Sequence, residues 1–210
     1  CDISSPEWTG LWRMGADYDA GKPENGLTGQ ISWVEFPSEI GVPSNYQKLR
    51  FWRNTTIPAL APGATAFLGV NTLGYEWDYE QTLFAGSNPA GRITLSNRTA
   101  NSRTHKLSLY RAASGAWVFG AGTVQWSWGL DGNHFGGTTT VSPEMQQATI
   151  NLFADMDVQP ATLQTGMVAA NKSSDVTAPV SALVTPPNGT SGSVGSPITI
   201  SGTVSDNGGG

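Results

Sequence analysis

The aromatic residues of this chain stop abruptly part-way along it. Every Trp, Tyr and Phe lies between Trp8 and Phe153, although the chain has 210 residues. Aromatic side chains dominate the cores in which they pack, so a segment without them builds a different kind of core. We therefore predict an aromatic-rich domain at 1–170, a linker at 171–179 and a separate segment at 180–210.

The composition narrows the classes of fold and partner. With 26 Gly and 13 Pro, the chain favours turns and strands over helices. Its net charge of −5, without a block of Lys or Arg, argues against a nucleic-acid partner. No run approaches the roughly 18 apolar residues of a membrane span. Low charge with abundant Thr, Ser, Asn and Gly is typical of secreted bacterial proteins, so we predict a secreted or cell-surface location.

Cys1 is the only cysteine, which excludes an intrachain disulfide and a cysteine-based zinc site. It has two interpretations, a lipid-modified first residue or a thiol at an arbitrary cut point. We favour the cut point because no signal peptide precedes it. The sequence then reads as a fragment of a longer protein.

The stretch from Gly115 to His134 is the strongest local pattern. An apolar run at 116–119 breaks at Gly120–Gly122, resumes through two tryptophans and ends in a polar cluster that includes Asp131 and His134. This pattern predicts a buried strand entering a tight turn. The glycines allow a positive φ or the close approach of another group. The stretch is either a strand that delivers a site or a Trp-rich core strand without one.

Elsewhere the pattern predicts short antiparallel strands and one helix. Ser142 suits the N-cap and Pro143 the first helical position, so we predict a helix near 143–157 that covers the sheet face containing 116–119. A weaker helical turn is expected at 161–169. The expected strands are 31–34, 49–52, 66–70, 73–77, 91–96 and 105–110. The polar residues at 97–103 are expected to be exposed.

The tail beyond Ala178 predicts strand, turn, strand. Ile198, Ile200 and Val204 fall on one face at period two. The segment resembles the first two strands of a bacterial immunoglobulin-like repeat.

Three polar groupings could carry chemistry. Glu76 and Asp78 share a face of an expected strand and could bind a metal, or they could simply point into water. Asp131 and His134 could supply an acid, a base or a ligand, or form only a loop turn. The third grouping, Arg50 and Arg53, could clamp a carboxylate, stack on aromatic rings or lie on an exposed strand face. Familiar nucleophile and nucleotide-binding motifs are absent from the sequence.

Several segments, taken in order, are similar to the C-terminal part of the N,N-dimethylformamidase large-subunit-like family. Many proteins with this domain carry immunoglobulin-like repeats after it. The resemblance covers roughly 6–170. The segments are Pro6-Glu7-Trp8-Thr9-Gly10, 23–29, 48–55, Leu73-Gly74-Tyr75-Glu76-Trp77-Asp78 and 118–131.

The resemblance implies an α+β fold that is mostly β: a partial class I amidotransferase-like α/β core with a β-rich insertion, plus a β-hairpin-like immunoglobulin-like tail. It also implies hydrolysis of an amide C–N bond at a mononuclear iron held by two tyrosines and a glutamate. Glu76 is the best match to that glutamate. The motifs that bear the tyrosines are absent from this chain, so we expect it to be inactive alone.

Three functional readings follow. The chain is a fragment of an amidase-like enzyme whose partners are the rest of the parent polypeptide and a small amide. Alternatively, it is a non-catalytic extracellular module that binds glycans or packs structurally. In the third reading it assembles with neighbouring subunits by pairing its tail strands.

Overall fold

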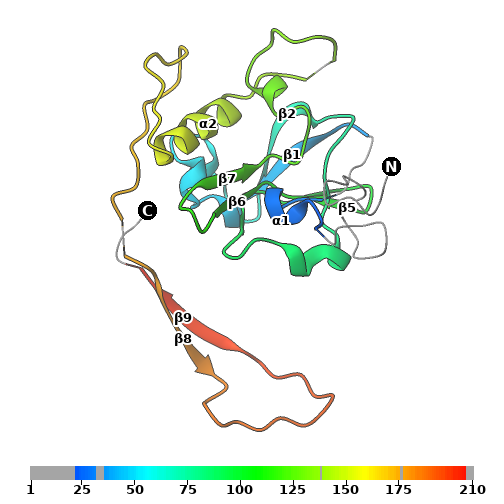
Figure 1. Ribbon diagram of the computed structural model, residues 1–210, viewed down its shortest axis with the longest axis vertical. Coiled ribbons are helices and arrows are strands. Elements are labelled where there is room, and N and C mark those ends of the chain that lie inside the picture. The colour runs from blue at the N-terminus through cyan, green and yellow to red at the C-terminus, as the bar shows by residue number, and fades with distance from the viewer. Residues whose placement is uncertain (1–21, 32–35, 138, 176, 207–210) are drawn as a thin grey trace, which may run out of the picture. The chain divides into compact units, whose positions relative to one another are not determined.

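The computed structural model describes residues 22–31, 36–137, 139–175 and 177–206 (Figure 1). The chain forms two compact units that divide between Asn171 and Lys172. Cys1 and most of the strand expected at 31–34 lie outside the described residues. The exact boundaries of the domains and linker stay a prediction.

The first unit is built from small antiparallel sheets, which confirms that the fold is β-rich. The amidotransferase-like core stays a prediction. The sheets pair β1 with β2, β4 with β5, and β3, β6 and β7 in the order β3-β6-β7. Their bounds are β1 Ser38–Pro43, β2 Thr65–Leu73, β3 Ile93–Thr94, β4 Arg98–Ala100, β5 Arg103–His105, β6 Ser108–Arg111 and β7 Trp117–Gly120.

Short helices fill the connections of the first unit. The α-helices are α1 Asn25–Thr28 and α2 Pro143–Asp155. The 3₁₀ helices are η1 Ser44–Tyr46, η2 Arg50–Trp52, η3 Ile57–Ala59, η4 Thr82–Ser87 and η5 Ser127–Gly129.

The β1–β2 pair supplies much of the hydrophobic core. Ile40, Val42, Leu68 and Leu73 are buried there. A single strand, β2, replaces the two strands that the sequence predicts on either side of Asn71. The strand passes through Asn71 because asparagine tolerates the left-handed φ of 58° found there. The separate strand predicted at 73–77 is therefore wrong.

The strand predicted at 116–119 is confirmed as β7, but it is less buried than predicted. It is half-buried and lies at the edge of the described sheet, with β6 in the centre. The strands predicted at 91–96 and 105–110 correspond to the shorter strands β3 and β6. The polar stretch expected to be exposed at 97–103 forms the β4–β5 hairpin, in which 97, 99 and 101–103 are exposed and Asn101 and Ser102 take positive φ.

The strand predicted at 49–52 is wrong, because this segment forms the 3₁₀ helix η2. Successive strand residues point to opposite faces, whereas the neighbours Phe51 and Trp52 are both buried in one core. Trp52 is fully buried, and its indole Nε1 donates to the carbonyl of Leu95 at 2.8 Å. A helical turn allows both rings to enter that core.

The predicted helix is confirmed as α2, and Ser142 Oγ accepts from the Met145 amide at 3.4 Å. The helix packs mainly on η2 rather than directly on the β7 face (Figure 1). Phe51 of η2 stacks on Phe119 of β7, with ring centroids 5.5 Å apart. The helical turn predicted at 161–169 is absent; that segment is irregular instead.

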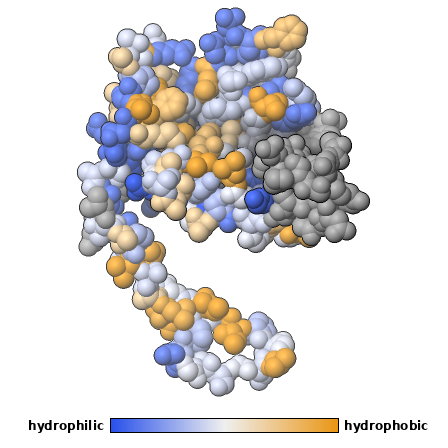
Figure 2. Space-filling model, in the orientation of Figure 1, coloured by the Kyte–Doolittle hydropathy of each residue, from blue (hydrophilic) through white to orange (hydrophobic). Residues whose placement is uncertain are grey.

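The second unit contains an antiparallel pair, β8 Val180–Thr185 and β9 Ser201–Ser205, which confirms a hairpin. Its likeness to an immunoglobulin-like repeat stays a prediction. Apolar residues are exposed along it, as the orange surface of the tail in Figure 2 shows. They are Val180, Leu183, Val184, Val194, Ile198, Ile200 and Val204.

Candidate functional site

The structure brings the Glu76 segment against the residues that follow β7. Trp77 forms an antiparallel bridge with Thr123. The Asp78 amide donates to the Gly122 carbonyl at 2.8 Å, and the Val124 amide donates to the Glu76 carbonyl at 3.2 Å. Two stretches that the sequence treats separately therefore form one site.

Successive side chains along the 76–78 segment point alternately to the surface and to the core. Trp77 is 1% exposed, and its indole Nε1 donates to the Phe36 carbonyl at 2.8 Å. Its neighbours Glu76 and Asp78 point the other way, and Glu76 is exposed. The buried tryptophan thus fixes the backbone from which the two acidic side chains project.

These side chains border a pocket of about 700 Å³. Glu24, beside α1, contributes a third carboxyl group, so the pocket wall is acidic. The other residues that line it are Leu27, Thr28, Trp77, Val118, Phe119, Gly120, Ala121, Gly122, Thr123 and Val124. An acidic, open pocket suits hydrogen-bond donors and cations.

The glycines after β7 are required by close approach and by backbone angle, as predicted. A Cβ on Gly120 would lie 2.3 Å from the Thr28 carbonyl oxygen and 2.6 Å from Ser108 Oγ. Gln30 Nε2 donates to the Gly120 carbonyl. Gly122 takes a φ of 58°, which side chains disfavour. These contacts bring α1 against the floor of the pocket.

The second sequence candidate, Asp131 with His134, does not line this pocket. Asp131 is exposed, and its Oδ1 accepts from the Asn133 amide at 2.7 Å, as in a simple turn. His134 stacks on Trp128 with ring centroids 4.4 Å apart, and its Nδ1 lies 3.0 Å from the Gly136 carbonyl oxygen. These contacts fit the loop-turn interpretation, and a catalytic role for either residue stays a prediction.

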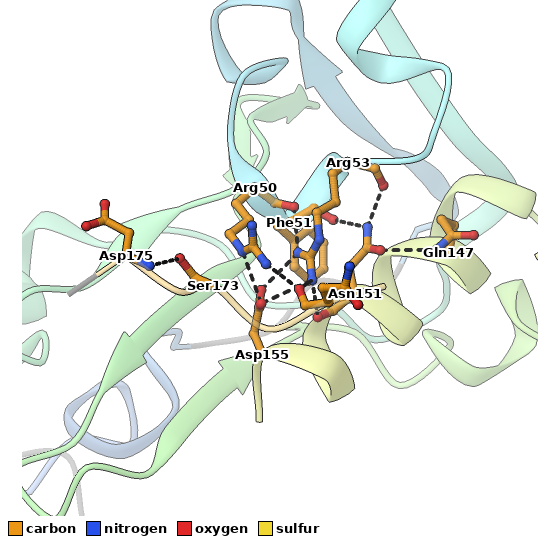
Figure 3. Close-up of polar contacts among 9 residues, drawn as sticks. Arg50, Phe51, Arg53, Gln147, Asn151, Asp155, Ser173 and Asp175 are labelled. Atoms are coloured by element: carbon orange, nitrogen blue, oxygen red, sulfur yellow. Dashed lines mark hydrogen bonds and ion pairs between the residues drawn. The ribbon is translucent and has the colours of Figure 1, made fainter. Parts of the chain in front are cut away.

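Arg50 and Arg53 do clamp a carboxylate, but it belongs to this chain (Figure 3). Both guanidinium groups converge on Asp155 at the end of α2, with nitrogen–oxygen distances of 3.0 Å for Arg50 and 2.9 Å for Arg53. Both also donate to the Asn171 carbonyl. Burial lowers the pKa of Arg53, against the opposing effects of the hydrogen bond and charge of Asp155. The cluster therefore holds the end of α2 against the η2 segment.

The amide side chains of α2 add further hydrogen bonds between the helix and neighbouring segments. Asn151 Nδ2 donates to the carbonyls of Phe51, at 2.9 Å, and Arg53, at 2.6 Å. Gln147 exchanges two hydrogen bonds of 2.8 Å with the backbone of Val168. The side-chain amides of Gln147 and Asn151 are therefore buried and hydrogen-bonded to the backbone of neighbouring segments; Figure 3 shows both residues beside Arg53.

His105 is a buried titratable group that sequence reasoning missed. It is fully buried, its Nε2 lies 2.9 Å from the Ala121 carbonyl oxygen, and its ring meets Trp77 edge-on. Burial lowers the pKa of His105 to about 4, although hydrogen bonds to Ala121 and Gly122 act in the opposite direction. Its short, polar strand gives no sequence signal of burial.

Residues 2–139 match the family described as N,N-dimethylformamidase beta subunit-like, C-terminal. The chain belongs to this family. No curated protein and no solved structure matches the chain. The dimethylformamidase-like region contains Glu24, Glu76, Asp78 and the rest of the pocket, whereas α2 and the tail hairpin follow it. The match names a beta subunit, and it does not test the assignment to a large subunit.

The iron that the dimethylformamidase resemblance implies can be tested against these residues. Within the described part of the chain, no group of three or more His, Cys, Asp or Glu could hold a metal ion. Specific metal sites usually need three or more protein ligands. The expected iron ligands are two tyrosines and one glutamate, a set that this observation does not cover, so the iron site stays a prediction. No helix among the described residues is long and apolar enough to cross a membrane.

Proposed function

We propose that this chain is a module of a dimethylformamidase-related amide hydrolase and contributes Glu76 and one wall of its reaction site. The observation that carries the proposal is the pocket itself. Its acidic residues and the Val118–Val124 wall come from distant segments, and all of them lie within the family match.

The chemistry assigned to the module is that of an oriented carboxylate. Glu76 borders an open pocket, and its backbone is held by the hydrogen bond from the Val124 amide and by the buried ring of Trp77. A carboxylate in that position can accept a hydrogen bond from water or from a substrate N–H and can orient it. Cleaving an amide also requires stabilising the developing oxyanion, and we propose that groups outside the described residues do this.

The proposed iron site likewise needs groups from outside this chain. Because the tyrosine-bearing motifs of the family are absent from this sequence, we assign no step of the reaction to iron held by this chain. We propose that Glu76 joins ligands from the rest of a longer, secreted or cell-surface bacterial polypeptide. The low charge content of 13% supports that location.

The first test is activity of the purified chain. With N,N-dimethylformamide and added Fe²⁺, we expect release of dimethylamine no faster than in a protein-free control. Sustained turnover by residues 1–210 would contradict the proposal that the site needs further groups.

The second test uses the longer protein. Glu76→Gln should reduce the hydrolysis rate at least about 100-fold, the usual effect of losing a group that transfers or orients a proton. Glu39→Gln is the matched control, since Glu39 pairs with Arg98 at 3.5 Å and does not line the pocket. Equal rates for the two variants would remove Glu76 from the reaction.

A second candidate function rests on the tail. The β8–β9 hairpin exposes apolar side chains on both strands (Figure 2), and an isolated two-stranded hairpin is marginally stable in water. We propose, as the alternative, that it pairs with the hairpin of a second copy. Sedimentation velocity should then show a dimer for residues 1–210 and a monomer for residues 1–171. The alternative of a glycan-binding role stays a prediction; the exposed rings of Phe67, Tyr75 and Phe135 are the candidates for stacking on a sugar.

A further inference from the structure

His105, the last residue of β5, contacts both of the segments that pair along the Glu76 pocket. Its ring meets the ring of Trp77 edge-on, with ring centroids 6.0 Å apart. Its Nε2 lies 2.9 Å from the carbonyl oxygen of Ala121. Trp77 and Ala121 both line the pocket, whereas His105 does not. His105 can therefore hold these segments in place without touching a molecule bound in the pocket.

The hydrogen bonds around His105 join three segments pairwise. Two backbone hydrogen bonds and a β-bridge attach 76–78 to 122–124. The amide of Glu80 donates to the Thr104 carbonyl at 2.8 Å, which attaches the chain that continues from 76–78 to β5. The side chain of His105, the next residue after Thr104, bonds to the residue just before 122–124. The His105 side chain thus completes a closed set of contacts around the segment that carries the acidic side chains.

These contacts decide which nitrogen of the His105 ring carries the proton. A carbonyl oxygen can only accept, so Nε2 carries the proton and donates to Ala121. Burial lowers the pKa of His105 to about 4, so the ring is neutral at pH 7 and Nδ1 bears a lone pair. Nδ1 is buried and has no hydrogen-bond partner among the described residues.

Packing alone does not explain a histidine at this position. His105 is fully buried, and burying its unpaired Nδ1 opposes folding. A leucine would fill much of the same space without burying a polar atom. A leucine, however, has no donor for the Ala121 carbonyl, so 121–124 would lose its side-chain bond to β5. Departures of this kind from the most stable choice are expected near functional sites.

We propose that His105 is a positioning residue for Glu76, acting through the Ala121 carbonyl and the ring of Trp77. The inference rests on the function proposed for the Glu76 pocket and names a further residue of that site. While His105 holds 121–124, this segment stays paired with 76–78, and the carboxylate of Glu76 keeps its place on the pocket. Precise placement matters because a displacement of about 1 Å at a reaction site can slow a reaction about 100-fold.

Amide hydrogen exchange of the purified chain tests the positioning without any hydrolysis. His105→Leu removes the donor, whereas His105→Gln is the matched control because its side-chain amide can still donate to the same carbonyl. In His105→Leu, the amides of Asp78 and Val124 should exchange at least about tenfold faster than in wild type, because the pairing that protects them opens locally. The amide of Gln146, in α2, should change less than about threefold. In His105→Gln, all three amides should stay within about threefold of wild type.

Three exchange results would overturn the proposal. Equal acceleration of all three amides in His105→Leu would mean that the histidine only adds general stability. Acceleration of none would mean that the bond to Ala121 holds nothing in place. Equal acceleration of Asp78 and Val124 in both variants would mean that the donor is not the cause.

Nitrogen NMR of the wild-type chain at pH 7 gives a check that needs no variant. The Nε2 of His105 should carry the proton and its Nδ1 should not. The opposite tautomer would overturn the proposal, because Nε2 could then not donate to Ala121.

Kinetics of the longer protein separate this inference from the proposed function. With N,N-dimethylformamide, His105→Leu should lower kcat at least about tenfold and leave KM within about threefold, and His105→Gln should keep kcat within about threefold of wild type. If Glu76→Gln slows hydrolysis and His105→Leu does not, the positioning role is wrong and the proposed function stands. If Glu76→Gln leaves the rate unchanged, the proposed function fails, and hydrogen exchange alone decides whether His105 holds the segment.

Discussion

Arg53 and Asp155 lie 102 residues apart and form a two-point ion pair, Nη1 to Oδ2 at 2.9 Å and Nη2 to Oδ1 at 3.1 Å. Paired contacts of this kind are stronger and more directional than single ones. The same guanidinium also donates to the Asn151 carbonyl at 3.0 Å. This one arginine therefore attaches the end of α2 to the segment after η2 (Figure 3).

Asp155→Asn tests that attachment. The variant leaves Arg50 and Arg53 without their carboxylate while their nitrogens stay half-buried. After allowing for partial solvent screening, we expect unfolding free energy to fall by roughly 1–3 kcal/mol. Urea titration measures it. The control is Asp131→Asn, which keeps an oxygen for the Asn133 amide and should change stability by less than about 0.5 kcal/mol. Equal losses for the two variants would show that the ion pairs add no stability.

His105 predicts a loss of stability in acid. Its pKa is about 4 when folded against an ordinary value of 6.5, so the unfolded chain binds more protons between those pH values. The contribution is fully present above about pH 6.5 and is lost as pH falls toward 4, by roughly 2 kcal/mol at pH 5. Denaturant titrations at pH 7 and 5 should show a smaller pH difference for His105→Gln than for wild type. A His105→Gln variant that loses as much stability as wild type between pH 7 and 5 would contradict this assignment.

Burial separates two tryptophans that the sequence treats alike. Trp52 is fully buried and hydrogen-bonded to Leu95, whereas Trp126 is half-buried and packs edge-on against Phe119. Trp52→Ala should cost about 4 kcal/mol and Trp126→Ala about 2 kcal/mol, because a truncation costs more where the lost ring was enclosed. Thermal or chemical unfolding measures both. The reverse order would mean that the core is centred on Trp126.

Gly120→Ala should strain the junction between β7 and α1. The added methyl would lie 2.3 Å from the Thr28 carbonyl oxygen, and backbone on one side must move. We expect a loss of about 2 kcal/mol, measured by guanidinium titration. Gly86→Ala meets nothing within 4 Å and should be neutral or stabilising by up to about 1 kcal/mol. Stability unchanged in both variants would mean that the close approach at Gly120 relaxes freely.

The local sequence determined the features that depend on local chemistry. Ser142 and Pro143 specify where α2 begins because a cap and a fixed φ need no distant partner. The glycines at 120 and 122 correctly predicted a close approach and a turn. The apolar run at 116–119 predicted a strand, and the ordered motifs predicted the family. The strand-turn-strand pattern of the tail predicted its antiparallel pair, although Ile198 and Ile200 precede β9.

Tertiary contacts decided the rest. Residues 49–52 fit a strand pattern, but two adjacent rings enter one core and require a helical turn. Arg50 and Arg53 looked like surface charges until α2 brought Asp155 to them. The pairing of 76–78 with 122–124, which places Glu76 on the pocket, joins segments over 40 residues apart. No spacing in a single sequence encodes such a contact, because it arises only when the distant segments pack together.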